Sequence, residues 1–310
     1  MSTVNHNAPD DPSWYRLDEN THALILRVIQ ERALEVTRAA IQPVAIILGG
    51  QPGAGKAALA SEALDDLGGN AVKVDADETR KFHPDYVALM NEDDRSAADR
   101  THADAGPWAA KLTSAAIAGR RHLVIDGTMR DPVGLSKLCQ KLRNAGYRIE
   151  ARVMAVNALV SRMSIHERYE RQLEVNGYGR WTNRDKHDAA FNGVPLTVES
   201  LEADCLVDRI TVVARNGDAP LYDNRLVDGA WEHPPTARTS IEAERSRDWT
   251  EAERTRFSEK LDRVTNILEQ RGASALDLAG VAELRADFEA TRPALTPTTP
   301  TQKIRLQTKG

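Results

Sequence analysis

The sequence predicts an α/β fold, in which a mainly parallel sheet is flanked by helices. Five short apolar runs rich in β-branched residues alternate with segments of helical periodicity, and strands joined through helices pair in parallel. Most runs are apolar throughout, which is expected where helices cover both faces of a sheet. A glycine-rich turn over residues 49–55 follows the first run and precedes a helical pattern, which is the arrangement of a phosphate-binding loop.

The predicted elements follow one another in a regular order. A helix is expected over residues 23–41, where apolar residues recur at helical spacing until Pro43 stops it. The expected strands are residues 44–48, 71–74, 123–125, 149–156 and 210–214. The expected helices that alternate with them are residues 56–67, 106–118, 133–145, 157–175 and 198–203. This order predicts crossover connections between parallel strands.

The character of the sequence changes after about residue 235. The turn-rich segment HPPTARTS ends the alternation, and two amphipathic, charge-rich helices are expected over residues 250–270 and 275–291. A tail rich in Pro and Thr follows, and such a composition forms no packed core. We therefore expect four parts, which are residues 1–22 (a flexible arm), 23–235 (the α/β domain), 236–291 (a helical extension) and 292–310 (a disordered tail).

The composition is typical of a soluble protein. The 310 residues include 41 Lys and Arg against 46 Asp and Glu, a net charge of −5, whereas a nucleic-acid-binding protein carries a basic footprint. Only two cysteines occur, so no disulfide framework is expected. The polar N-terminus has no secretory pattern, and no apolar run reaches the ~18 residues of a membrane span. We expect a cytoplasmic protein without nucleic-acid or membrane partners.

The sharpest motif lies directly after the first expected strand. Gly50, Gly55 and Lys56 occupy the first three fixed positions of the pattern G-x-x-x-x-G-K-[ST]. Glycines let the backbone N–H groups point at phosphate oxygens, the helix N-terminus adds partial positive charge, and the lysine reaches the β- and γ-phosphates. We expect an ATP-binding loop formed by Gly50, Gln51, Pro52, Gly53, Ala54, Gly55, Lys56 and Ala57.

The fourth fixed position departs from this pattern. Ala57 stands where Ser or Thr normally supplies a hydroxyl to Mg²⁺, and an alanine side chain coordinates no metal. Nucleotide is still expected to bind through the loop amides and Lys56. The motif therefore supports nucleotide binding and leaves the magnesium ligand open.

Acidic residues follow the second and third expected strands. Ligands of open α/β sheets lie at the carboxyl ends of the strands, where Asp75, Asp77 and Asp126 stand. One of the first two is expected to be the general base that a kinase requires, and helix N-capping, which suits Asp77, is the alternative. Asp126 is expected to hold Mg²⁺ directly or through water. His83, a few residues further on, is expected only to contact the substrate.

Three arginines lie in or after the expected helix 157–175. Arg168 lies late in the helix, and Arg180 and Arg184 lie in the glycine-containing segment that follows. Small P-loop kinases use arginines of such a lid to neutralise charge on the transferring phosphoryl group. An exposed helix face with a glycine-rich connection is the alternative interpretation.

Taken in order, five segments resemble the zeta toxin family, the P-loop kinases of bacterial toxin–antitoxin systems. They are residues 48–56 (LGGQPGAGK), 75–77 (DAD) followed by His83-Pro84, 124–130 (VIDGTMR), 154–156 (MAV) and 167–170 (ERYE). The resemblance covers about residues 20–225. It implies a P-loop kinase-like fold for the α/β domain.

The resemblance also implies an activity and a set of site residues. The family phosphorylates, with ATP and Mg²⁺, the 3′-hydroxyl of the amino sugar in UDP-N-acetylglucosamine. By motif position, Asp77 is similar to the family's general base and Lys56 to its phosphate-binding lysine. Thr128 and Arg130 fall where the family contacts the sugar nucleotide.

The arginines of this chain also match positions of the family. Arg168 falls at one phosphate-stabilising arginine, and Arg180 is the expected second one, with Arg184 as the alternative. A family glutamate on the helix before the third strand has no counterpart, because Ala110 or Lys111 occupies that region. Substrate choice is therefore less firmly implied than the fold.

The expected partners follow from the same resemblance. They are a small-molecule substrate and a small helical antitoxin that blocks the nucleotide site. Two other functions stay open at this point. One is a kinase of another small acceptor, such as a nucleotide or NAD, and the other is a catalytically impaired nucleotide-binding module that binds an antitoxin, an option that Ala57 keeps open.

Overall fold

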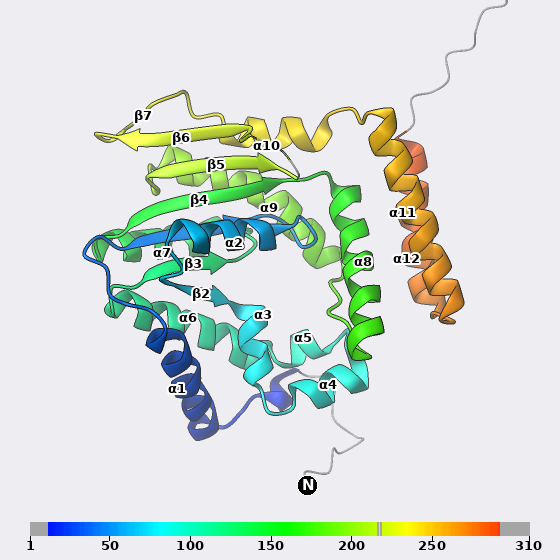
Figure 1. The fold of residues 1–310 in the computed structure, drawn as a ribbon, viewed down its shortest axis with the longest axis horizontal. Coiled ribbons are helices and arrows are strands. Elements are labelled where there is room, and N and C mark those ends of the chain that lie inside the picture. The colour runs from blue at the N-terminus through cyan, green and yellow to red at the C-terminus, as the bar shows by residue number, and fades with distance from the viewer. Residues whose placement is uncertain (1–11, 216, 218, 292–310) are drawn as a thin grey trace, which may run out of the picture.

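A seven-stranded sheet forms the centre of the computed structural model, which describes residues 12–215, 217 and 219–291 (Figure 1). The strand order is β2-β3-β1-β4-β5-β6-β7. The first five strands pair in parallel, and β6 and β7 add antiparallel at one edge. The strands are β1 (Val44–Gly49), β2 (Ala71–Asp75), β3 (His122–Asp126), β4 (Arg148–Ala155), β5 (Arg209–Ala214), β6 (Tyr222–Val227) and β7 (Ala230–Trp231). The predicted α/β class with a mainly parallel sheet is confirmed.

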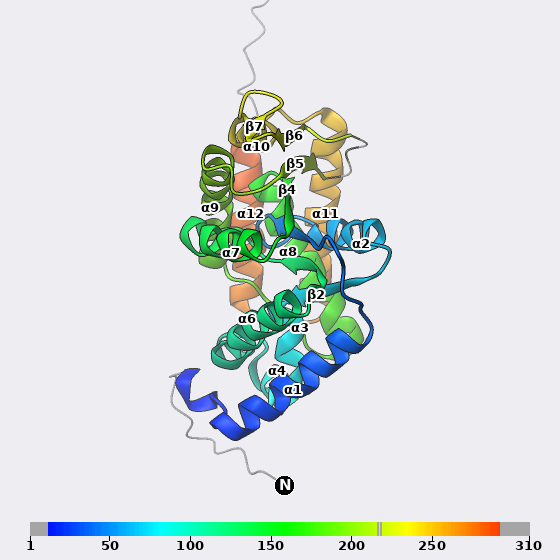
Figure 2. The same ribbon diagram turned by 90° about the vertical axis from the view of Figure 1, so that its left-hand side faces the viewer.

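Helices pack on both faces of the sheet, as Figure 2 shows with the sheet seen edge-on. One apolar core joins the sheet to α1, α6, α7, α9 and α10, and a smaller core on the opposite face joins it to α2. Successive residues of β1 alternate between the two cores, because side chains of a strand point to opposite faces. The helices are α1 (Glu19–Glu35), α2 (Lys56–Asp66), α3 (Ala76–Thr79), α4 (Tyr86–Asp93), α5 (Ala97–Arg100), α6 (His102–Ala118), α7 (Pro132–Asn144), α8 (Ala158–Asn176), α9 (Arg184–Ala203), α10 (Ala237–Ser246), α11 (Glu251–Gln270) and α12 (Ala275–Ala290).

The first helix lies earlier in the chain than predicted. α1 begins at Glu19 because the Asp18 carboxylate caps its first turn. It ends at Glu35 rather than at residue 41, because the chain then pairs with the segment before β3. There the N–H of Ala40 donates to the carbonyl of Arg120 at 2.9 Å. A tertiary hydrogen bond therefore replaces the last predicted helical turn.

The two predicted terminal parts reach beyond the described residues. Residues 1–11 of the expected arm and the whole expected tail, 292–310, lie outside them. The rest of the arm is not loose, because it forms a 3₁₀ helix (Pro12–Tyr15) and the start of α1. The N–H of Leu17 also donates to the carboxylate of Asp104 on α6 at 3.1 Å.

Two predictions near β5 are corrected by the structure. The short helix predicted over residues 198–203 is the end of α9, whose pattern is interrupted by Gly193 and Pro195. Glycine is needed there, because a Cβ at Gly193 would lie 2.5 Å from the carbonyl oxygen of Arg130. The antiparallel strands β6 and β7 have no counterpart among the predicted strands. They lack an apolar run, and β6 is joined to β5 partly by an ion pair between Arg209 and Asp223 at 2.7 Å.

The helical extension does not begin as a separate unit at residue 236. α10 starts at Ala237, inside the segment predicted to be a break, and its Ile241 lies in the core that covers the sheet. α11 and α12 instead form their own apolar cluster against α8. We therefore propose that the α/β unit includes α10 and that the extension consists of α11 and α12.

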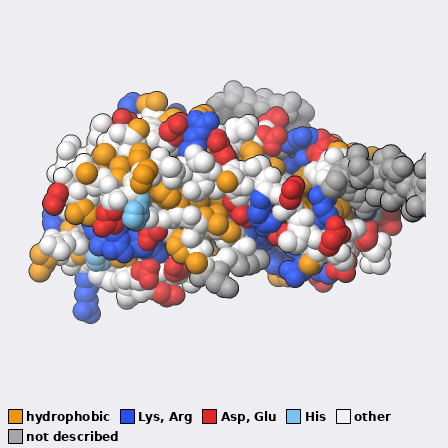
Figure 3. Space-filling model, turned by 90° about the horizontal axis from the view of Figure 1, so that it is seen from above, with side chains coloured by type: hydrophobic (Ala, Val, Ile, Leu, Met, Phe, Trp, Pro, Cys, Tyr) orange, Lys and Arg blue, Asp and Glu red, His pale blue; other side chains and the backbone are white. Residues whose placement is uncertain are grey.

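The surface carries both signs of charge. Figure 3 looks down on the molecule from above the view of Figure 1 and shows acidic and basic side chains intermingled over that face. Among the described residues, no helix is long and apolar enough to cross a lipid bilayer.

Candidate active site

The phosphate-loop sequence forms a tight turn between β1 and α2. Gly50, Gly53 and Gly55 have φ angles of 144°, 79° and 100°, which only glycine adopts readily. The Lys56 ammonium donates to the carbonyl of Gly50 at 2.9 Å, so the lysine folds back over the loop. A Cβ at Gly53 would lie 2.0 Å from the carbonyl oxygen of Ser161 on α8. The loop therefore has the backbone that the motif predicts and is pressed against α8.

The other loop residues face in different directions. Gln51 and Ala54 are fully buried, so their side chains do not face a ligand. Ala57, the second residue of α2, is exposed and brings no oxygen to the loop. The structure thus places a helix N-terminus and Lys56 at the loop without the usual hydroxyl.

The three candidate carboxylates gather at one edge of the sheet. β2 and β3 pair so that Asp75 is the Cα partner of Asp126, which in turn is the partner of Leu48 at the end of β1. Asp75 caps α3 by accepting a hydrogen bond from the N–H of Asp77 at 2.9 Å. The capping role thus belongs to Asp75, and the Asp77 carboxylate is left for other partners.

Asp77 lies between two arginines. Its carboxylate accepts from the Nε of Arg80 at 3.1 Å and forms an ion pair with Arg180. Burial by itself would raise the pKa of Asp77, but the positive charges of Arg180 and Arg80 hold it below its ordinary value. The carboxylate is therefore ionised at neutral pH, as a general base must be.

Arg168 is a half-buried cation beside this pair. One of its NH₂ groups donates to the carbonyl of Arg180 and to the hydroxyl of Thr182, both at 3.2 Å, while its buried Nε has no hydrogen-bond partner. Burial and the nearby charge of Arg180 lower the pKa of Arg168 to about 10. Within the described part of the chain it forms no ion pair with a carboxylate. An anion entering the site would meet a cation whose charge the nearby Asp77 offsets without a direct ion pair.

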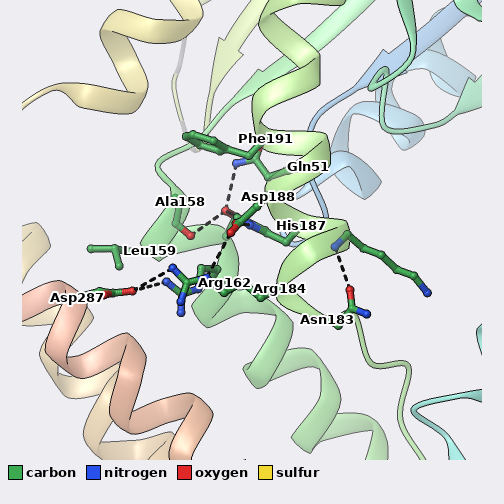
Figure 4. A network of polar contacts seen from close by, with 12 residues as sticks. Gln51, Ala158, Leu159, Arg162, Asn183, Arg184, His187, Asp188, Phe191 and Asp287 are labelled. Atoms are coloured by element: carbon green, nitrogen blue, oxygen red, sulfur yellow. Dashed lines mark hydrogen bonds and ion pairs between the residues drawn. The ribbon is translucent and has the colours of Figure 1, made fainter.

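Arg180 and Arg184 have different surroundings. Arg184 begins α9 and forms ion pairs with Asp188 at 3.3 Å and with Asp287 on α12 at 3.9 Å (Figure 4). It also pairs with Glu283 on α12, so it faces the extension. Arg180 instead reaches the carboxylate of Asp77. Of the two arginines that the sequence left open, the structure brings only Arg180 to the carboxylate cluster.

The loop that carries Arg180 is held by residues that the sequence did not single out. Asp94 accepts from the N–H of Gly179 at 2.7 Å. The Arg95 guanidinium stacks over the ring of Trp181, with its Cζ 4.3 Å from the ring centroid. No local pattern reveals these roles, because Asp94 and Arg95 come from a turn about 85 residues before the loop in the chain.

The side chain of His83 has surroundings that differ from the predicted ones. Its side chain is completely buried, with Nε2 3.1 Å from the carbonyl oxygen of Tyr15 and Nδ1 accepting from the N–H of Asp85 at 3.2 Å. Both ring nitrogens are therefore occupied, and His83 packs the N-terminal segment instead of facing a substrate. Thr128 and Arg130 lie in the turn after β3, where the Thr128 carbonyl is 3.5 Å from the N–H of Gly50.

Lys56 and Asp126 make up the other side of the charge cluster. Burial lowers the pKa of Lys56, and the charged groups that act on it are Asp126, Arg180, Asp77 and Arg168. Burial raises the pKa of Asp126, while Lys56 opposes that shift. Among the described residues, no cluster of three or more His, Cys, Asp or Glu side chains forms a ready-made metal site.

A cavity of about 460 Å³ adjoins the phosphate loop. It opens at the carboxyl ends of β4 and β5, and α10 and α11 close its far side. Arg215 joins it to the loop, since its guanidinium donates to the hydroxyl of Ser164 at 2.6 Å and to the carbonyl of Gly53 at 3.4 Å. The wall of the cavity includes Val156, Asn157, Arg215, Trp249, Arg256 and Phe257.

Comparisons with known proteins identify the family of the chain. Residues 29–227 match the family model described as zeta toxin. The chain is 28% identical over 230 residues to toxin PezT of Streptococcus pneumoniae serotype 4, covering 74% of this chain and 88% of that protein. It is 29% identical over 192 residues to toxin zeta of Enterococcus hirae, covering 60% of this chain and 66% of that protein.

Solved structures give the same result. A structure from the PezAT chromosomal toxin–antitoxin system of S. pneumoniae superimposes with a TM-score of 0.70 and 25% identity, covering 82% of this chain and 99% of that one. The AvrRxo1-ORF1:-ORF2 complex with ATP has a TM-score of 0.52 at 14% identity, covering 87% and 88%, and shows likeness of fold alone. Since the family model spans more than half of the sequence, the chain belongs to the zeta toxin family and has the kinase-like fold of its relatives.

Proposed function

We propose that this chain is the toxin of a toxin–antitoxin system and acts in the cytoplasm as an ATP-dependent kinase of UDP-N-acetylglucosamine, at the 3′-hydroxyl of the amino sugar. One observation carries the kinase assignment. Beside a phosphate loop, the ionised Asp77 lies with Arg180, and the half-buried Arg168 forms no ion pair with a carboxylate among the described residues. Phosphoryl transfer needs such a set, which is a base for the acceptor hydroxyl and free cations for the charge of the phosphoryl group.

Each group has a distinct role in this proposal. The loop amides and Lys56 hold the donor phosphates. Asp77 accepts the proton of the acceptor hydroxyl, once the phosphates draw Arg180 away from it. Arg168 and Arg180 then offset the negative charge of the phosphoryl group in flight. Thr128 and Arg130, on the turn after β3, are proposed to contact the acceptor.

ATP is the proposed donor because a nucleoside has a place beside the loop. The cavity at the ends of β4 and β5 adjoins Gly53 through Arg215, and ligands of such sheets lie at this edge. ATP is present in the structure of the AvrRxo1-ORF1:-ORF2 complex, which has the same fold.

The residues at the loop fit Mg²⁺ only in part. Ala57 offers no oxygen, whereas Asp126 lies at the loop's edge of the sheet and acts electrostatically on Lys56. Among the described side chains none donates a hydrogen bond to the Asp126 carboxylate. We propose that Asp126, with phosphate oxygens and water, would hold the ion. Bound Mg²⁺ would neutralise charge on the β- and γ-phosphates.

The proposed macromolecular partner is a small helical antitoxin. The PezAT structure comes from a toxin–antitoxin system, and this chain matches 99% of the superimposed chain. A protein that occupies the phosphate loop would block the donor site and silence the toxin.

The activity is tested by incubating the chain with ATP, Mg²⁺ and UDP-N-acetylglucosamine and by following the products with mass spectrometry. We expect UDP-N-acetylglucosamine to gain one phosphate. Lys56→Met, which removes the phosphate-binding ammonium, is the inactive control. A metabolite extract is treated in parallel. Phosphate on a nucleotide or NAD instead of the sugar nucleotide would make another small-molecule kinase the better assignment.

Ala57 supports a second candidate, an impaired module that binds nucleotide and sequesters an antitoxin. We expect Ala57→Thr to raise kcat by about tenfold or more, because the added hydroxyl fixes Mg²⁺ on the phosphates and misplacement by an ångström costs on the order of 10²-fold. The matched control is Ala58→Thr, which adds the same atoms at the next exposed helix position. Steady-state kinetics of both variants check this. Equal turnover of the wild type and Ala57→Thr would show that another ligand already holds the ion, and nucleotide binding without turnover in either would favour the impaired module.

A further inference from the structure

A buried arginine lies behind the phosphate loop, on a helix outside the region that matches the family model. Arg245 of α10 is only 6% exposed, and residues 29–227 are the matched region. Its guanidinium donates to the Oε1 of Gln51 at 2.9 Å and to the carbonyl of Phe191 at 2.7 Å. The Cζ of Arg245 also lies 4.1 Å from the centroid of the Phe191 ring. Arg245 therefore touches the loop directly.

The charge of Arg245 has no paired carboxylate among the described residues. Its buried Nε finds no hydrogen-bond partner in the part of the chain that the structure describes. Within the described residues no carboxylate forms an ion pair with it, and the acidic group that acts on it, Glu242, is exposed and paired with Arg238 at 2.8 Å. Burial lowers the pKa of Arg245 to about 10. A buried cation of this kind costs stability unless another negative charge compensates it.

Gln51 connects this cation to the loop. Its side chain is fully buried, and its Nε2 donates to the carbonyl of Val156 at 2.8 Å and to the hydroxyl of Ser161 at 3.1 Å. Ser161 in turn lies 2.8 Å from the Nε2 of His187 on α9, and Figure 4 shows Gln51 beside His187 and Phe191. The carbonyl of Gln51 also accepts from the N–H of Ala54 within the loop. The buried side chain of Gln51 thus supports the loop backbone, and its acceptor atom, Oε1, is hydrogen-bonded to Arg245.

We propose that Arg245 is a positioning residue of the phosphate site, which holds Gln51 so that the loop amides face the ligand and supplies a buried positive charge that bound polyphosphate compensates. The inference rests on the proposed function only in that the loop binds the phosphates of a donor. It adds a requirement that the loop motif does not contain, which is a cation from α10.

The test compares substitutions that separate charge from shape. Arg245→Lys keeps the charge, whereas Arg245→Gln keeps a hydrogen-bond donor, on a shorter side chain, without the charge. Arg245→Met introduces an apolar side chain and removes both the charge and the hydrogen bonds. The variant is expected to fold, because buried charges are often replaced by apolar side chains without loss of folding. Arg285→Gln, which breaks a surface ion pair with Asp262, changes the net charge equally and is the control. Binding of ATP and of inorganic tripolyphosphate is titrated by calorimetry at 10 °C, with thermal unfolding of each variant recorded. A pH of 6.5 is used because burial lowers the pKa of a lysine.

We expect Arg245→Gln and Arg245→Met to weaken the binding of both ligands by about tenfold or more, since a unit charge acts more strongly on polyphosphate in a partly buried site than in water. Arg245→Lys is expected to stay within about threefold of the wild type, and Arg285→Gln to bind like it. Equal affinities of the Lys and Gln variants would overturn the charge role. If the wild type binds tripolyphosphate but not ATP, the proposal that ATP is the donor is wrong. The role of Arg245 is then decided by the affinities of the variants for tripolyphosphate. If it binds neither, both proposals are wrong.

Discussion

Asp77→Asn is expected to lower kcat by about 10²–10⁴-fold, the usual contribution of a positioned general base. The affinity for ATP is expected to stay within a few-fold, because Asn keeps the size of the side chain and the phosphates are held by the loop and Lys56. Single-turnover rates and calorimetric binding of ATP separate the two effects. Because Arg180 and Arg80 hold the pKa of Asp77 below its ordinary value of 3.8, the kcat/KM of the wild type is expected to show no acidic limb from this group above pH 5.

The matched control for this substitution is Asp75→Asn. Asp75 caps α3 through the N–H of Asp77, and Asn caps helices about as well as Asp. We therefore expect Asp75→Asn to keep kcat within a few-fold. If Asp75→Asn is inactive and Asp77→Asn is active, the base is Asp75, and the ion pair of Asp77 with Arg180 only fixes the loop.

Arg168→Ala is expected to lower kcat by about 10³-fold or more, the effect of an arginine that stabilises phosphoryl transfer. Arg168 is half-buried, and its Nε has no hydrogen-bond partner among the described residues, so its charge is available to a phosphoryl group. The KM for ATP is expected to change much less, because the guanidinium matters most where charge develops. The ratio of the two effects is read from steady-state kinetics at saturating acceptor.

Two further substitutions make this result specific to the site. Arg180→Ala is expected to lower kcat to a similar extent, because Arg180 reaches the Asp77 carboxylate. Arg184→Ala is expected to keep kcat within a few-fold, since Arg184 pairs with Asp188 and with α12. An unchanged kcat for Arg168→Ala, or an equal loss for Arg184→Ala, would contradict the assignment of the lid arginines.

Most of the sheet and the phosphate loop could be predicted from the sequence. The apolar runs of β1 to β5 and the glycines of the loop act through their own residues and nearest neighbours, so the pattern in the chain is the cause of the local structure. The position of Asp77 after β2 was also visible, together with the order of motifs that indicated the zeta toxin family. The sequence likewise showed that the side chain of Ala57 cannot coordinate a metal ion.

Only the tertiary structure decided how the charged residues of the site pair. Asp75 rather than Asp77 is the helix cap, which depends on the backbone turn after β2. Arg180 rather than Arg184 reaches the Asp77 carboxylate, because Arg184 is already the first residue of α9 and its side chain pairs with α12.

The packing of distant segments decided the remaining roles. His83 is buried against Tyr15, 68 residues away in the chain, and Arg245 reaches Gln51 across 194 residues. Periodicity and motif spacing report on contacts within a few turns of the chain, whereas a buried charge or ring takes its role from whatever the fold packs beside it. The sequence by itself therefore determined the family, the five parallel strands and the phosphate loop, while the fold determined which charged side chains meet near the loop and which lie buried behind it.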